Sequence, residues 1–245
     1  MRDVPPECGV GGSKTRKVSM EVDTMRRLIA AALLGAVAVT PLSAALSESE
    51  AKRIDEAATV LRELHAAPDQ DVPLDLWQKA SCVMVIPSLK KAAFILGGEY
   101  GKGLMSCRHG NDWSAPLFMR LEKGSWGLQF GAQTIDLVLL VMNDKGIEKL
   151  LGNGVTLGAE ASAAAGPVGR DARAATDLQM RAEILSYSRT QGVFAGVNLS
   201  GGSLRDDQDN NADLYGKGIT ARQVLLEKRV QLPGIARPFI EALNR

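Results

Sequence analysis

A succession of short apolar segments between residues 82 and 142 sets the strongest limit on what this chain can fold into. The segments have strand length and are separated by clusters of Gly, Asn, Asp and Ser. Connections this short join antiparallel neighbours, because parallel strands need long crossovers. Glycine recurs within them, which indicates a strongly coiled sheet. The predicted strands cover residues 82–86, 92–96, 103–108, 117–121, 126–131 and 134–142.

Helical patterns flank this predicted sheet on both sides. Ser47 and Glu50 have the spacing of a capping box, and apolar residues follow at helical spacing until Pro68 ends the helix. The predicted class is therefore α+β, with a strongly curved antiparallel, barrel-like sheet and flanking N- and C-terminal helices. Further helices are predicted at 71–80, 144–151, 221–228 and 238–243, and further strands at 155–165, 182–189 and 193–199.

The N-terminal part has the order of a secretory signal peptide in residues 25–45. Two arginines precede an apolar run over residues 28–39, and small residues follow it. The run has roughly a dozen residues, whereas a membrane-spanning helix needs about 20. We expect residues 1–24 to be an untranslated or disordered leader. Residues 46–245, which contain no Ser/Pro-rich linker, should form a single domain in the periplasm or outside the cell.

The charge balance and the motifs exclude several classes of function. The chain has 29 Lys and Arg against 28 Asp and Glu, whereas nucleic-acid-binding proteins usually carry a basic excess. It has two histidines, His65 and His109, and neither a G-x-S-x-G elbow nor a zinc-site spacing. We therefore expect no nucleic-acid partner, no enzymatic activity, and no metal or cofactor.

Two polar motifs each have a chemical and a structural interpretation. The segment GGEYGKG at 97–103 resembles a phosphate-binding loop, but it is one residue short and has Gly103 in place of the Ser or Thr that binds magnesium. A glycine-rich β-turn is therefore favoured. The segment RDDQDNNADLYG at 205–216 has part of a calcium-loop pattern but lacks its Gly and its Glu. A polar turn leading to a packed Tyr215 is favoured over a calcium site.

Cys82 and Cys107 are the cysteines of the expected mature domain, since Cys8 lies in the leader. In an oxidising compartment such a pair can form a disulfide. Two reduced residues buried separately are an equally good interpretation, because the spacing in sequence does not fix the distance between the two side chains.

Basic residues recur in the predicted turns, where each one alone is typical of a solvated surface. If they lie on a common face, each contributes about 1 kcal/mol of attraction to an anionic membrane. The last two residues of the set follow a Gly-Pro turn, which either presents them to a phosphate or only shapes the loop. The set is Lys90, Lys91, Lys102, Arg108, Lys123, Arg170 and Arg173.

Several motifs in series resemble the SYLF domain, and the resemblance covers about residues 54–243. It implies an exported lipid-binding protein without a catalytic reaction; eukaryotic members bind phosphoinositide membranes, and some act on actin. The motifs are ASCVMVIPSLKKAAFILGGEYGKG (80–103), WSAP (113–116), GSWGLQFG (124–131), AAGPVGR (164–170), SYSRTQGVFAGV (186–197) and LYG (214–216).

The resemblance and the basic residues together predict recognition of anionic phospholipid head groups at a membrane surface, with a glycerophospholipid such as phosphatidylglycerol as the preferred ligand. Some eukaryotic members bind membranes through a basic amphipathic N-terminal helix, but the corresponding helix here is charge-balanced. The basic loop residues are therefore the predicted lipid-binding site. The alternative is a structural or interaction protein of the cell envelope that binds a protein partner.

Overall fold

The structure is a computed structural model that describes residues 46–66, 71–93, 96–126, 131–152, 154–168, 181–190 and 193–244. These residues belong to one compact unit, Ala44–Arg245. The unit contains every described helix and strand and two large hydrophobic cores. We therefore expect residues 46–245 to fold without the residues before them. The predicted leader and signal peptide lie outside the described residues.

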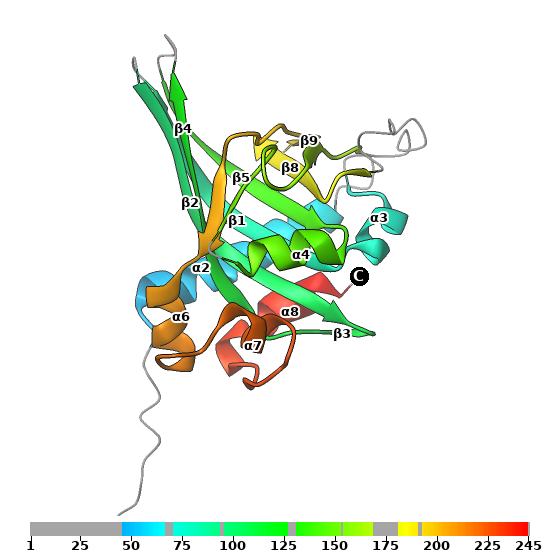
Figure 1. Ribbon diagram of the computed structural model, residues 1–245, viewed down its shortest axis with the longest axis vertical. Coiled ribbons are helices and arrows are strands. Elements are labelled where there is room, and N and C mark those ends of the chain that lie inside the picture. The colour runs from blue at the N-terminus through cyan, green and yellow to red at the C-terminus, as the bar shows by residue number, and fades with distance from the viewer. Residues whose placement is uncertain are drawn as a thin grey trace, which may run out of the picture. The chain divides into compact units, whose positions relative to one another are not determined.

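Within the described residues, ten strands form a strongly curled sheet (Figure 1). Its main path runs β6-β10-β4-β2-β1-β5-β8-β7, while β3 pairs with β2 and β9 pairs with β8. The paired strands are antiparallel, except for the parallel pair β7–β8. This confirms the predicted α+β class. The strands are β1 (Cys82–Ala93), β2 (Leu96–His109), β3 (Asp112–Trp113), β4 (Leu117–Trp126), β5 (Gly131–Val141), β6 (Val155–Thr156), β7 (Ala163–Ala165), β8 (Ile184–Thr190), β9 (Val193–Gly196) and β10 (Ser203–Asp206).

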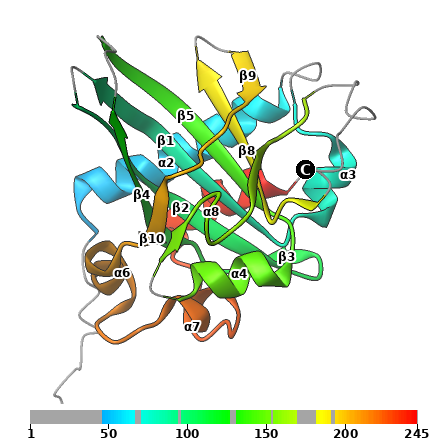
Figure 2. The same ribbon diagram turned by 45° about the horizontal axis from the view of Figure 1, so that its top comes forward.

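Helices lie against both faces of the sheet (Figure 2), and the central part of the sheet is buried on both sides. Helices α2, α3 and α8 cover one face, which buries Leu104 and Phe118 and is here called the α2 face. Helices α4 and α7 cover the other face, which buries Met105 and Met119 and is called the α4 face. Burial on both sides explains why the strands read as continuous apolar runs. The helices are α2 (Glu48–His65), α3 (Leu74–Lys79), α4 (Asp144–Leu150), α6 (Gln208–Tyr215), α7 (Ala221–Leu225), the 3-10 helix η2 (Gly234–Ala236) and α8 (Arg237–Leu243).

The long helix α2 begins at the predicted capping box. The Ser47 hydroxyl accepts a hydrogen bond from the Glu50 backbone N–H at 3.3 Å, and the Ser47 N–H donates to the Glu50 carboxylate at 2.7 Å. Such a cap stabilises a helix by about 1 kcal/mol. The apolar side chains of Ile54, Leu61 and Leu64 are buried against the sheet and α8. The helix thus packs in the core, as its sequence pattern indicates.

Strand β1 runs without a break through Cys82–Ala93, although the sequence pattern predicts separate strands at 82–86 and 92–96. A bulge explains the difference, because the register of β1 against β2 shifts between Val85 and Lys90. Within the bulge, Ser88 has a φ of 58°, and its N–H donates to the Asp136 carboxylate at 3.0 Å. The segment GGEYGKG consequently lies inside β2, where a β-turn was predicted.

The acidic segment 205–216 forms the end of β10 and helix α6, where a polar turn was predicted. Asn211 explains why this segment forms a helix packed on the sheet. Its buried side chain accepts a hydrogen bond from Phe118 N–H at 2.7 Å and donates one to Phe118 O at 2.9 Å. Tyr215 packs against the same region, and its hydroxyl donates to the carbonyl of Pro116. These bonds attach α6 to the beginning of β4.

Cys82 and Cys107 form a disulfide that joins β1 to β2. The two residues are directly opposed across the strand pair, and both are buried in the core of the α4 face. The bond therefore fixes the beginning of β1 to the end of β2. It closes the hairpin that carries both the bulge and the glycine-rich segment.

Removal of this disulfide is expected to lower the free energy of unfolding by about 3 kcal/mol, since it no longer restricts the unfolded chain across a separation of 25 residues. Urea unfolding of residues 46–245 should show the loss in the double variant Cys82→Ala, Cys107→Ala. A reducing agent should destabilise the unmodified domain and leave the double variant unchanged. Equal stability of the two proteins would contradict a bond at this position.

Candidate functional site

The structure divides the predicted basic residues between the two faces of the sheet. Lys90 is exposed on the α2 face, where it lies opposite Tyr100 of the neighbouring strand. Lys91 and Lys123 lie on the α4 face, in strands on either side of Glu99. The Lys91 ammonium is 3.4 Å from the Glu99 carboxylate. These lysines therefore do not form one cationic surface.

Arg108 connects β2 to α3. Its guanidinium donates to the carbonyl of Trp77 at 3.2 Å and lies 4.2 Å from the ring centroid of Trp113. Burial lowers the pKa of Arg108 from its ordinary value. Because its contacts are made within the fold, Arg108 has a structural role. Arg170 and Arg173 lie outside the described residues.

Lys102 is the partner of a buried carboxylate. Its Nζ is 2.6 Å from Oδ2 of Asp207, whose side chain is 2% exposed, and it donates to Oδ1 of Asn210 at 2.9 Å. Asn210 in turn donates to the carboxylate of Glu50 in the first turn of α2. This network connects β2, α6 and α2. Lys102 therefore also has a structural role.

Lys102 begins a row of cations that sequence reasoning missed. Arg120 of β4 lies directly opposite Lys102, and Arg205 of β10 lies directly opposite Arg120. Directly opposed side chains share one face of a sheet, with Cβ atoms about 4.5–5.5 Å apart. Lys102, Arg120 and Arg205 are here called the cation row. Since like charges in this arrangement repel each other, the row favours an anion beside it.

The two arginines of the cation row have weak partners among the described residues. Arg120 Nε is 3.6 Å from a carboxylate oxygen of Glu122, which is longer than a hydrogen bond. Arg205 donates to the uncharged hydroxyl of Ser203 at 3.1 Å and forms no ion pair within the described ranges. The Nε atoms of both arginines are buried, and neither has a hydrogen-bond partner among the described residues. Guanidinium N–H groups of this kind bind phosphate and carboxylate oxygens.

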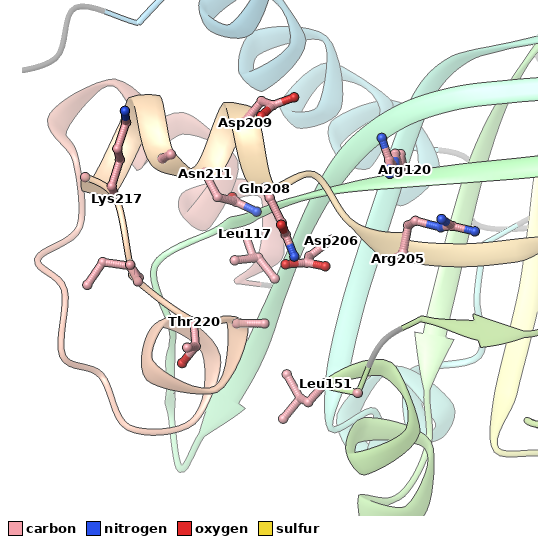
Figure 3. A pocket seen from close by; sticks show the side chains of 16 residues that line it. Leu117, Arg120, Leu151, Arg205, Asp206, Gln208, Asp209, Asn211, Lys217 and Thr220 are labelled. Carbon is pink, nitrogen blue, oxygen red and sulfur yellow. The ribbon is translucent and has the colours of Figure 1, made fainter.

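A cleft of about 850 Å³ is lined in part by these two arginines (Figure 3). Its walls come from β4, β10, α6, the end of α4 and the segment that leads into α7. Figure 3 shows Arg120 and Arg205 at one end of the cleft and Lys217 at the other. Asp206 and Asp209 also contribute to the lining, so the cations outnumber the carboxylates by one. The cleft suits a polar ligand with negative charge at the arginine end.

Both histidines lie away from this cleft. His65 Nδ1 is 3.4 Å from a carboxylate oxygen of Asp71, and its ring packs edge-on against Trp77 at a centroid distance of 4.6 Å. A ring nitrogen of His109 is 2.7 Å from the carbonyl of Leu225. Within the described ranges, no group of three His, Cys, Asp or Glu side chains could hold a metal ion. None of the helices in that same part of the chain is long and apolar enough to cross a membrane.

The profile of the Ysc84 family, described as "Las17-binding protein actin regulator", matches residues 122–245. This chain belongs to the Ysc84 family. The match confirms the resemblance to the SYLF domain and includes β10, α6 and α7, which border the cleft. Arg205 lies within the matched part, while Arg120 lies just before it.

Ysc84-family relatives align over most of this chain. An SH3 domain-containing protein of Schizosaccharomyces pombe is 36% identical over 66% of the chain and 38% of its own length. The SH3 domain-containing YSC84-like protein 1 of Rattus norvegicus is 31% identical over 80% of the chain and 58% of its own length. LAS seventeen-binding protein 3 of Saccharomyces cerevisiae is 30% identical over 72% of the chain and 39% of its own length. The chain thus spans between 38% and 58% of the length of these relatives.

Proposed function

We propose that this chain is an exported, non-catalytic protein that binds anionic phospholipid at a membrane surface. One observation carries the proposal: Arg120 and Arg205 are directly opposed on neighbouring strands and line a cleft, and both have a buried Nε without an acceptor among the described residues. A phospholipid phosphate placed between them accepts hydrogen bonds from both guanidinium groups and relieves their mutual repulsion.

The surroundings of the arginine pair support a ligand at a bilayer surface. The Arg120 side chain is 35% exposed, so a head group can reach it without unfolding of the sheet. Lys90 and Tyr100 are exposed on the same face, farther along the neighbouring strands. Tyrosine and lysine side chains at such positions suit the boundary between water and lipid. The proposed head-group site thus keeps Lys90 from the sequence-based set and adds the two arginines.

The arginine pair should determine the affinity for anionic vesicles. In residues 46–245, the double variant Arg120→Gln, Arg205→Gln is expected to bind phosphatidylglycerol vesicles about 30-fold more weakly, because each basic residue contributes about 1 kcal/mol. Vesicle sedimentation measures the change. The matched control is Lys52→Gln, Lys79→Gln, which removes the same charge from exposed helical positions with i,i+4 partners.

Binding of the unmodified domain should weaken as salt rises and be absent with phosphatidylcholine vesicles. Unfolding experiments on both double variants check that neither substitution affects the fold. Equal sedimentation with the two lipids, or equal loss in the arginine and lysine variants, would contradict a head-group site at Arg120 and Arg205.

The description of the family and the name of one relative favour a second candidate function. The matched family is described as Las17-binding, and one relative is called LAS seventeen-binding protein 3. The cation row could equally receive the acidic side chains of a protein partner, as expected for a structural or interaction protein of the envelope. Capture of one partner from envelope extract, independent of lipid and lost in the variant Arg120→Gln, Arg205→Gln, would favour this candidate.

A further inference from the structure

Two exposed apolar side chains lie close together in the connection between α7 and α8. Among the described residues, five large hydrophobic side chains are exposed, and two of them are Leu232, 40% exposed, and Ile235, 44% exposed. The other three, Leu74, Tyr100 and Val193, lie in separate elements or at their ends. The segment 226–236 that carries the first two is here called the α7–α8 loop, and Leu232 and Ile235 are called its apolar tip.

The α7–α8 loop is fixed at both ends, so the exposure of its tip does not result from a loose chain end. Before the loop, Val224 and Leu225 are buried in the core of the α4 face. At its end, Ala236, the last residue of the loop, and Phe239 of α8 are buried in the core of the α2 face. The Ala236 N–H also donates to the carbonyl of Pro233 at 2.9 Å, which closes the turn at the tip. The packed ends of the loop therefore hold its apolar tip in an exposed position.

Cations lie on both sides of this apolar tip. Lys228 and Arg229 precede it, Arg237 follows it, and all three are exposed. Glu227 is the acidic residue of this stretch and pairs with Arg229 at 2.7 Å, so the loop keeps a positive charge. Aliphatic side chains flanked by Lys and Arg match the boundary of an anionic bilayer, where acyl chains lie beneath phosphates.

We infer that the α7–α8 loop inserts Leu232 and Ile235 into the acyl-chain boundary of an anionic bilayer while its flanking cations contact phosphate groups. The inference rests on the proposed function and names the element that enters the membrane. The loop directly follows α7, whose first residue, Ala221, lines the cleft. A lipid surface is favoured over a protein groove because the cations surround the apolar pair on both sides.

An environment-sensitive fluorophore at the tip tests this inference. We suggest Leu232→Cys in residues 46–245, labelled with a nitrobenzoxadiazole dye; the remaining cysteines are protected in the disulfide. The matched control is Leu74→Cys, since Leu74 is also an exposed leucine and lies beside Asp75 on α3. With phosphatidylglycerol vesicles, the dye at position 232 should shift to the blue and gain intensity several-fold. The dye at position 74 should not respond.

The outcomes separate this inference from the proposed function. If the labelled protein sediments with phosphatidylglycerol vesicles while the dye at position 232 does not respond, the loop does not insert and the proposed function stands. If the protein does not sediment with these vesicles, both fail. If the dye is already shifted in buffer and the protein is dimeric, a second copy covers the tip and the inference is overturned.

A second pair of variants tests the same inference without a label. Leu232→Ser with Ile235→Ser should weaken binding to phosphatidylglycerol vesicles about tenfold and make the remaining binding more sensitive to salt. Leu74→Ser with Val193→Ser removes a comparable exposed apolar surface and should leave the affinity unchanged. An equal effect of the two pairs would overturn the assignment to the loop. All four positions are exposed, so the variants are expected to fold.

Discussion

Replacement of Gly103 by alanine is expected to destabilise the domain by about 3 kcal/mol or more. A Cβ atom at this position would lie 2.0 Å from the carbonyl oxygen of Val85 and 2.8 Å from Cα of Ile86, at the bulge of β1. Both are backbone atoms, so strands β1 and β2 would have to separate. Forced rearrangement of a packed core lowers the free energy of unfolding by about 1–3 kcal/mol and occasionally by more. Chemical denaturation of residues 46–245 measures the change.

Gly124→Ala is the matched control for this prediction. Gly124 also lies within a strand, but no atom outside its immediate chain neighbours lies within 4 Å of the added Cβ. Alanine restricts the unfolded chain more than glycine, so this variant should be unchanged or stabilised by up to about 1 kcal/mol. If both variants were equally stable, β2 would not approach the β1 bulge as closely as described.

This bulge also explains why the sequence predicts β1 and β2 only in part. The apolar runs at both ends of the hairpin are visible because burial selects their residue types. The sequence pattern favours a turn for the glycine-rich segment, because local pattern cannot reveal a neighbouring backbone that excludes side chains at Gly103. The capping box at Ser47 and Glu50 was correctly predicted because all its atoms come from one turn of the chain.

The candidate site was less predictable because its members are brought together by strand register. Arg120 and Arg205 lie in segments far apart in sequence, and only the pairing of β4 with β10 places them opposite each other. Conversely, the sequence around Lys102 and Arg108 does not indicate that these side chains make ion pairs or hydrogen bonds within the fold. Asp207 reaches Lys102 through the folding of α6 against β4, which the sequence pattern of the acidic segment did not predict.

Lys102→Met is expected to lower the free energy of unfolding by about 3–5 kcal/mol. The substitution keeps a long, unbranched side chain but leaves the carboxylate of Asp207, 2% exposed, without its cation. Removal of one partner from a buried ion pair typically lowers the free energy of unfolding by this amount, because the remaining charge is buried without a partner. Urea unfolding of residues 46–245 measures it. The matched control is Lys90→Met, since Lys90 is exposed on the same face and forms no ion pair among the described residues.

A second substitution separates the charge effect from a packing defect. If the unpaired carboxylate causes the instability, Asp207→Asn combined with Lys102→Met should recover most of the lost stability, because no buried charge then remains. If the double variant were as unstable as Lys102→Met alone, loss of packing would be responsible. Recovery would also yield a stable protein with only the arginines of the cation row. Because Lys102 is already paired with Asp207, this protein should bind phosphatidylglycerol vesicles as tightly as the unmodified domain.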